Sequence, residues 1–404
     1  MFSNAFQSFL VLALAVSTDA SPVRRSTAGK LSLSRYLNVT GSRNLVQIDQ
    51  ARARLLGAST STTSQAALSE PVTNQGVVYS ASVGVGSGSS ITYYNLIIDT
   101  GSSNTFVGAV KPYISTTGQK TKNTVSVTYG SGSFSGTEWI DRVTLTSNLV
   151  ISKQSIGVAS KSSGFAPFDG ILGIGPVDLT KGTLSPDSSA LIPTVTDNLF
   201  SQHTIPVDSV AVSFEPASSN PTNNGELTWG GVDSSKFTGA INYAPITSSS
   251  PANKYWGVDQ SISYGAISIM SRKAGIVDTG TTLVMVASNT FALYKTLTGA
   301  KLDSQTGLLS ITSTQYKNLQ TLNFNINGHT YGLTPNAQIW PRSLNTAIGG
   351  SVDKIYLIVA DLGTGSGLSF IDGYTFLERF YTVFDTTNVR IGFATTPFTT
   401  ATSN

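Results

Sequence analysis

Two short motifs in the sequence could supply paired acid chemistry. Asp99-Thr100-Gly101 and Asp278-Thr279-Gly280 lie 179 residues apart, and each follows an apolar run, 96–98 in the first case and 275–277 in the second. A single Asp before Gly ordinarily indicates a turn. A carboxylate at the end of a buried strand, however, is costly unless it is hydrogen-bonded or paired. The repetition therefore predicts that the two carboxyl groups act together.

Two carboxyl groups within hydrogen-bonding distance cannot both ionise easily, so one pKa falls and the other rises. Such a pair holds one proton and can bind a water molecule. The ionised group can accept a proton from that water as it attacks a peptide carbonyl, and the protonated group can donate to the oxyanion and the leaving nitrogen. Asp99 and Asp278 are therefore predicted to be catalytic.

The residues next to each Asp are predicted to support it. Glycine permits a tight turn, threonine can hydrogen-bond across the two motifs, and a hydroxyl can donate to the outer carboxylate oxygen. Because both carboxyls have a hydroxyl neighbour, the sequence leaves open which of them carries the proton. In the order of these roles, the residues are Gly101 and Gly280, Thr100 and Thr279, and Ser102 and Thr281.

The elements that must position the motifs are predicted to be strands. Segments such as 77–83 and 93–98 are rich in β-branched and aromatic residues and are bounded by Gly, Ser, Asn and Pro. Helical spacing of apolar residues is confined to 44–56, 194–200 and 289–297. The repeated motif in a chain of 404 residues predicts an all-β protein of two homologous lobes, each of which supplies one Asp.

Composition argues against several other classes of protein. Charged residues make up only 12% of the chain, which disfavours nucleic-acid binding. Cysteine is absent, so disulfides and thiolate chemistry are excluded. The only two histidines, His203 and His329, lie outside any recognisable setting for a serine hydrolase. We expect no metal and no organic cofactor.

The front of the chain differs from the rest. Residues 9–16 form an apolar run that is too short to span a bilayer and resembles a secretory signal, although no basic residue precedes it. Residues 1–69 carry seven basic and two acidic side chains, whereas the remainder has a slight acidic excess. The predicted organisation is a signal peptide at 1–20, a basic propeptide at 21–66, an N-terminal lobe at 67–248 and a C-terminal lobe at 249–404.

Further motifs along the chain resemble one known family. Together with the two triads they make the sequence similar to the pepsin-like aspartic endopeptidases, and in particular to the secreted enzymes of basidiomycete fungi. The resemblance covers nearly the whole chain and implies a bilobal pepsin-like fold of two pseudo-symmetric, barrel-like lobes with a substrate cleft between them. The motifs are 127–133, 167–175, 227–233, 255–258 and 380–385.

The resemblance also implies how substrate binds. Tyr129, Gly130 and Ser131 would lie on a mobile hairpin that closes over an extended peptide, with Ile97 and Ile171 beside the scissile bond. These side chains favour bulky hydrophobic residues in the substrate. The expected activity is acid-pH endoproteolysis by a secreted monomer, with protein and peptide substrates, sensitivity to pepstatin-like inhibitors, and no nucleic-acid or membrane partner.

The propeptide of this family is an intramolecular inhibitor whose basic residues pair with the catalytic carboxylates. Lys30 and Arg35 are the candidates for this pairing. Acid would protonate carboxylates of the body and weaken the attraction, so that the propeptide is released. Folding assistance is compatible with the same segment, and a solvated run of charge is the alternative interpretation.

Three positions depart from the pattern of the family. Phe106 stands where a Trp usually bonds the hairpin Tyr, Ser131 stands where some relatives carry Asp, and Asp372 interrupts an apolar pair before Gly373. A buried Asp372 would need hydrogen-bond partners that the sequence does not identify. A non-catalytic binding protein of the same shape is the main alternative, but such proteins generally have damage at one triad or at the hairpin.

Overall fold

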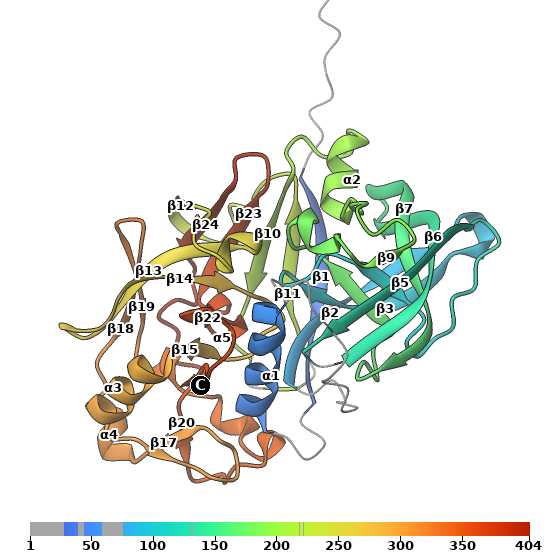
Figure 1. Ribbon diagram of the computed structural model, residues 1–404. Helices are drawn as coiled ribbons and strands as arrows, with labels where there is room; N and C mark the ends of the chain where they lie inside the picture. The colour runs from blue at the N-terminus through green and yellow to red at the C-terminus, as the bar shows by residue number, and fades with distance from the viewer. Residues whose placement is uncertain (1–27, 39–43, 59–75, 131, 218, 221) are drawn as a thin grey trace, which may run out of the picture.

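The computed structural model describes residues 28–38, 44–58, 76–130, 132–217, 219–220 and 222–404. Strands form most of the regular structure in these ranges, and Figure 1 shows them gathered into two lobes on either side of a central group of strands. The predicted all-β, bilobal fold class is confirmed.

The strands of the first lobe close into a barrel-like ring. In spatial order the strands are β2 (Gly76–Val85), β3 (Thr92–Asp99), β8 (Gly170–Gly173), β4 (Thr105–Val107), β7 (Leu149–Ser163), β6 (Gly132–Thr146), β5 (Gln119–Tyr129) and β9 (Leu184–Ser185). Most neighbours are antiparallel, but β3 lies parallel to β8 and β4 lies parallel to β7. The ring closes because β6 also pairs with β2, where Gly84 lies opposite Thr144.

A strand from the front of the chain lies in the centre of the molecule. β1 (Gly29–Asn38) is antiparallel to β2 on one side and to β11 (Thr222–Trp229) on the other. The segment predicted to be a propeptide therefore contributes a complete strand between the lobes. Beyond β11 the sheet continues through β10 (Ser209–Phe214), β23 (Phe380–Asp385), β24 (Arg390–Thr395) and β12 (Thr238–Pro245).

The second lobe is built on a seven-stranded sheet with a small three-stranded sheet beside it. The seven strands are, in order, β19 (His329–Leu333), β18 (Leu322–Ile326), β13 (Gly257–Tyr264), β14 (Ile267–Val277), β22 (Phe370–Asp372), β15 (Val284–Val286) and β21 (Val359–Asp361). The small sheet contains β16 (Lys301–Leu302), β17 (Leu309–Ile311) and β20 (Ile355–Tyr356).

The three helical segments predicted from the sequence are present as α1 (Leu45–Ala58), α2 (Val195–Ser201) and α3 (Ser288–Thr298). α2 begins with a capping box, in which Thr194 and Asp197 each accept the backbone N–H of the other. The structure adds two short helices, α4 (Ser313–Lys317) and α5 (Tyr374–Leu377). Figure 1 shows α1 between the two lobes, where it contacts β21.

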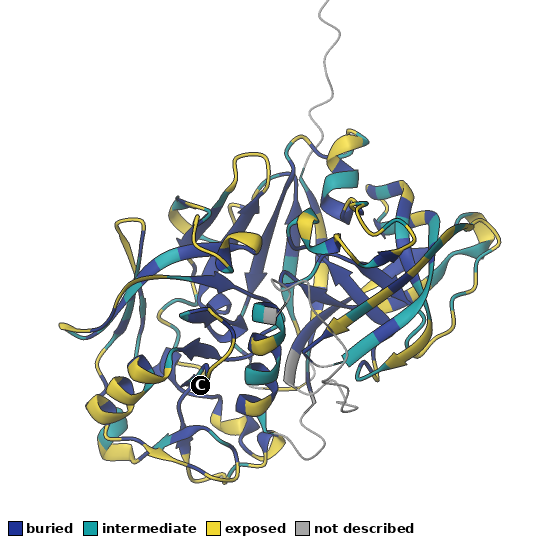
Figure 2. Ribbon diagram, in the orientation of Figure 1, coloured by how far each residue is buried: buried dark blue, intermediate teal, exposed yellow. Residues whose placement is uncertain are grey.

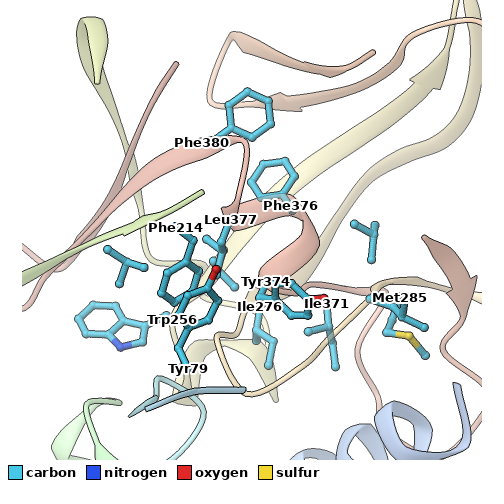
Figure 3. Close-up of a cluster of buried hydrophobic side chains, with 14 of the residues drawn as sticks. Tyr79, Phe214, Trp256, Ile276, Met285, Ile371, Tyr374, Phe376, Leu377 and Phe380 are labelled. Atoms are coloured by element: carbon cyan, nitrogen blue, oxygen red, sulfur yellow. The ribbon is translucent and has the colours of Figure 1, made fainter. Parts of the chain in front are cut away.

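The core is continuous across the meeting point of the lobes. Figure 2 shows buried residues concentrated along the strands and exposed residues at the loops and outer helix faces. Tyr79 stacks on Phe214 with ring centroids 3.7 Å apart. Figure 3 shows Tyr374, Ile276 and Ile371 in the same buried cluster. The strand that carries the second triad therefore packs on apolar side chains drawn from both halves of the chain.

The internal repeat is visible in the strand register. β3 lies parallel to β8, with Ile98 opposite Leu172. β14 lies parallel to β22, with Val277 opposite Asp372. A third strand is antiparallel to β8 or β22 in each lobe, β4 in the first and β15 in the second. The two triads are therefore presented by equivalent strand arrangements.

Candidate active site

The structure brings the two triads together at the meeting point of the lobes. The backbone N–H of Thr100 donates to the hydroxyl of Thr279 at 3.0 Å, and the N–H of Thr279 donates to the hydroxyl of Thr100 at 2.9 Å. These four groups are buried, so each bond replaces contact with water that is no longer available. The reciprocal pair fixes one triad relative to the other.

Each carboxylate has equivalent donors from its own triad. Oδ1 of Asp99 accepts the N–H of Gly101 at 3.0 Å, and Oδ2 accepts the hydroxyl of Ser102 at 2.6 Å. Oδ1 of Asp278 accepts the N–H of Gly280 at 3.1 Å, and Oδ2 accepts a hydroxyl at 2.6 Å. That last hydroxyl belongs to Thr281.

The two glycines allow the triads to approach closely. A Cβ on Gly101 would lie 2.8 Å from Oδ1 of Asp278, and a Cβ on Gly280 would lie 2.7 Å from Oδ1 of Asp99. Real Cβ atoms do not sit so near a carboxylate oxygen, so any larger residue would push the two carboxylates apart.

Arg52, from α1, lies between the carboxylates. Its Nη2 is 2.5 Å from Oδ1 of Asp99 and 2.9 Å from Oδ1 of Asp278, and its Nε is 2.6 Å from Oδ2 of Asp278. Burial alone would raise the pKa of Asp278, but the charge and hydrogen bonds of Arg52 outweigh it and hold that pKa below its usual value. The guanidinium occupies the centre of the site.

A second side chain of α1 binds the same region. Asp49 accepts the backbone N–H groups of Thr282 and Leu283 at 3.1 and 2.8 Å. Burial raises the pKa of Asp49 to about 7, against the opposing effect of these two bonds and of Arg52. Asp49 and Arg52 lie three residues apart and therefore on one face of the helix. That face covers the second triad and the backbone that follows it.

The prediction that Lys30 or Arg35 pairs with the catalytic carboxylates is wrong. Both lie on β1, whose register between β2 and β11 directs them to other partners. Lys30 forms ion pairs with Asp233 and Glu226. Arg35 is fully buried, with its Nη2 3.0 Å from the hydroxyl of Tyr374 and its Nε 3.3 Å from Oε1 of Glu378.

The predicted hairpin is present over the site. β5 ends at Tyr129, which lies opposite Gly132 at the start of β6, and Ser131 lies outside the described residues. A Cβ on Gly130 would overlap the backbone of Arg52, so α1 packs directly against the hairpin. The hydroxyl of Tyr129 has no hydrogen-bond partner among the described residues.

The side chains predicted to lie beside the scissile bond share one apolar cluster of the first lobe. Ile97 of β3 lies opposite Ile171 of β8, and both are buried. Tyr129 belongs to the same cluster, and its ring lies near that of Phe106 with centroids 6.0 Å apart and an interplanar angle of 24°. Phe106 therefore fills its position with ring contact and offers no hydrogen-bond donor.

Asp372, which the sequence left without partners, lies next to the second triad. Its backbone oxygen accepts the N–H of Asp278 at 3.1 Å, and its carboxyl accepts the side-chain N–H of Gln260 at 3.2 Å. Both histidines are exposed, His203 after α2 and His329 on β19. In the part of the chain that the structure describes, no group of three or more His, Cys, Asp or Glu residues is placed to hold a metal ion.

Comparison with known proteins agrees with this geometry. The sequence model described as eukaryotic aspartyl protease matches residues 78–396. Polyporopepsin from Irpex lacteus is 64% identical over 343 residues, which cover 84% of this chain and 100% of that protein. Cathepsin E-A from Xenopus laevis is 32% identical over 348 residues, 81% of each chain. The crystal structure of the aspartic proteinase from Irpex lacteus covers 93% of this chain and 100% of its own, with 57% identity and a TM-score of 0.80.

The chain therefore belongs to the eukaryotic aspartyl protease family. It is a pepsin-like aspartic endopeptidase that hydrolyses peptide bonds. The family match begins at residue 78, so it leaves α1 and β1 outside. No helix in the described ranges is long and apolar enough to cross a membrane.

Proposed function

We propose that Asp99 and Asp278 act as one catalytic pair that shares a proton and activates water, and that Arg52 blocks this pair until the front segment is removed. The observation that carries the proposal is the position of Arg52 Nη2, which bonds to Oδ1 of both carboxylates. Because one nitrogen reaches Oδ1 of both carboxylates, a water molecule at the same point could hydrogen-bond to both of them.

The chemistry follows from the donors around each carboxylate. With Arg52 gone, two buried carboxyls remain close together, and one of them takes up a proton because both cannot ionise easily. The ionised group accepts a proton from the bound water as its oxygen attacks the peptide carbonyl. The other group donates its proton to the developing oxyanion. The proton taken from water then passes to the leaving nitrogen as the C–N bond breaks, and a hydroxyl of the tetrahedral intermediate returns a proton to the second group, so that the pair again holds one proton. The hydroxyls of Ser102 and Thr281 donate to Oδ2 of Asp99 and of Asp278, so the two Oδ1 atoms remain available for these proton transfers.

The substrate is an extended polypeptide bound beneath the β5–β6 hairpin. Gly130 and Ser131 offer backbone hydrogen bonds, and the apolar cluster of Tyr129, Ile97 and Ile171 favours bulky hydrophobic side chains next to the scissile bond. The tight contact between Gly130 and α1 supports this assignment, because the helix lies where a substrate would pass under the hairpin.

The protein is made as a secreted zymogen and acts as a monomer without a cofactor. Residues 1–20 are its signal peptide, 21–66 its propeptide, and 67–248 and 249–404 its two lobes. Pepstatin-like inhibitors are expected to bind where Arg52 lies in the zymogen. Because Arg52 holds the pKa of Asp278 below its usual value, docking of α1 is strongest where that carboxylate is ionised, and it weakens as pH falls through the lowered pKa.

Cleavage of denatured globin at acid pH tests this function. The processed enzyme is expected to cleave, pepstatin is expected to stop it, and Asp99→Asn and Asp278→Asn are each expected to be inactive. Undiminished cleavage by either variant, or no cleavage by the processed wild type, would contradict the proposed function.

A further inference from the structure

Asp372 occupies a position where the first lobe has an apolar residue. It lies on β22 opposite Val277 and Val284, whereas the equivalent residue of β8, Leu172, lies opposite Ile98 and Thr105. Both Asp372 and Leu172 are fully buried. A side chain that can carry charge has therefore been placed beside only one of the two catalytic aspartates.

The partner of Asp372 shows the same difference between the lobes. Gln260 of β13 is fully buried and lies opposite Lys273 of β14. The equivalent residue of β2 is Val83, which is also fully buried and lies opposite Tyr94 of β3. Both members of the pair are polar in the second lobe, and both equivalents are apolar in the first. The acid and the amide therefore form a matched unit.

Gln260 and Asp372 form one hydrogen bond, and one oxygen atom of each side chain has no partner among the described residues. Gln260 Nε2 donates to Oδ1 of Asp372 at 3.2 Å. Among the described residues, neither Oδ2 of Asp372 nor Oε1 of Gln260 has a hydrogen-bond partner. Two buried acceptors without a donor are unfavourable. A single proton on Oδ2 would supply the missing donor, because a planar acid and a planar amide can close a ring through two hydrogen bonds.

We propose that Asp372 is a positioning residue that works as a neutral acid. It donates its proton to Oε1 of Gln260, and the closed pair joins β22 to β13 across β14. The backbone oxygen of Asp372 then keeps the N–H of Asp278, and with it the second catalytic carboxylate, in place. This inference rests on the proposed function only for its effect on catalysis.

The surroundings favour the neutral form. Burial raises the pKa of Asp372 to about 8, although the hydrogen bond from Gln260 acts in the opposite direction. No cation in the described ranges bonds to its carboxyl. The titratable and charged groups on the elements around it are Asp259 and Tyr264 of β13, Arg272 and Lys273 of β14, Asp278 directly after β14, Asp361 of β21, Tyr294 and Lys295 of α3, Tyr374 of α5, Glu378 after α5, and Asp49, Arg52 and Arg54 of α1. Arg52 is paired with Asp278, and Asp259 with Arg272.

The sign of the pH effect follows from the raised pKa. In the unfolded chain Asp372 titrates near the ordinary carboxyl value of about 4. The stability that the neutral pair contributes is therefore fully present below about pH 4 and is lost as pH rises through about 8. The second lobe is thus stabilised in the acid range where the enzyme works.

Asp372→Asn in the full chain tests the shared proton directly. Asn can form the same ring with Gln260 but cannot titrate. A positive carbonyl band of a protonated carboxyl is expected in the wild-type-minus-variant infrared difference spectrum at pH 6, in which the bands of other protonated carboxyls such as Asp49 and Glu378 cancel. The fall of Tm between pH 4 and 8 is expected to be smaller in the variant. Identical infrared spectra, or an unchanged slope of Tm, would overturn the proposal.

Kinetics of the processed enzyme test the positioning role. Asp372→Leu leaves Gln260 without a partner and is expected to lower kcat about tenfold with KM changed less than about twofold, whereas Asp372→Asn restores most of the loss. Equal losses in both variants would overturn the role. If Asp372→Leu does not fold, Gln260→Leu breaks the pair from its other side, and its kcat is compared with that of Asp372→Asn in the same way. The infrared band does not depend on catalysis, so its presence in a wild type that lacks pepstatin-sensitive cleavage would reject the proposed function alone.

Discussion

The two lobes hold the carboxylates of Asp99 and Asp278 with equivalent strands but with different neighbouring side chains. In the first lobe, the strand beside the triad presents the buried, apolar side chain of Leu172. In the second, the equivalent strand presents Asp372, bonded to Gln260. The two lobes therefore share the backbone geometry around the triads but not the side chains that stabilise it.

Helix α1 of the front segment also forms more hydrogen bonds to the second triad and the residues after it than to the first. Arg52 has one bond to Asp99 and two to Asp278, and Asp49 accepts two hydrogen bonds from the backbone that follows the second triad. The helix is therefore anchored mainly on the second lobe. The first lobe contributes the hairpin that packs on it.

The largest expected effect comes from removing Arg52. Breaking a buried ion pair by deleting one partner costs about 3–5 kcal/mol, so Arg52→Leu is expected to weaken docking of α1 by about 100-fold or more. Arg54→Leu, on the exposed side of the same helix, is the matched control. Initial cleavage of a peptide by the intact chain measures the effect. If the intact Arg52→Leu chain cleaves the peptide no faster at first than the intact Arg54→Leu chain, Arg52 does not block the site.

The next effect comes from moving the polar pair into the first lobe. Leu172→Asp buries a carboxyl at the position equivalent to Asp372, where the residue equivalent to Gln260 is the apolar Val83, and is expected to cost about 2–5 kcal/mol at neutral pH. Adding Val83→Gln is expected to recover part of the lost stability, because it supplies an amide partner for the introduced carboxyl. Thermal unfolding at pH 4 and 7 measures both variants. A double variant no more stable than Leu172→Asp would show that the two sites are not equivalent.

A smaller and symmetric effect is expected at the threonines that join the triads. Thr100→Val and Thr279→Val each leave a buried N–H unsatisfied, at a cost of about 1–3 kcal/mol. Because the two bonds are reciprocal, the losses in free energy of unfolding are expected to agree closely. Ser288→Ala, at an exposed bond to Asp361, serves as a control with little change. Clearly unequal losses at the two threonines would break the symmetry.

The smallest effect depends on pH and concerns Arg35. Burial raises the pKa of Glu378 to about 7 although Arg35 lowers it. The pair contributes to docking of β1 only where Glu378 is ionised, and this contribution is lost as pH falls through about 7. Arg35→Met is expected to speed release of the front segment at pH 8 by up to about tenfold and to change it little at pH 5. An equal change at both pH values would contradict this reason.

Much of this arrangement could be predicted from the sequence. The repeated Asp-Thr-Gly motif located both carboxylates, and apolar spacing located α1, α2 and α3. Arg52 was missed because net charge does not distinguish one basic residue from another. A signal was present, since Asp49 and Arg52 lie three residues apart within a predicted amphipathic helix. The partner of Asp372 could not be found, because Gln260 lies 112 residues away and only the folded sheet brings them together.

The most direct test of the central claim, that the two carboxylates work as one unit, is kcat/KM at acid pH for processed Asp99→Asn, Asp278→Asn and the double variant. Each single change is expected to lower kcat/KM by about 1,000-fold or more, with the double variant no lower than the singles, because groups that act as a unit are not additive. Independent losses that multiply in the double variant, or a single variant with near wild-type activity, would contradict the account.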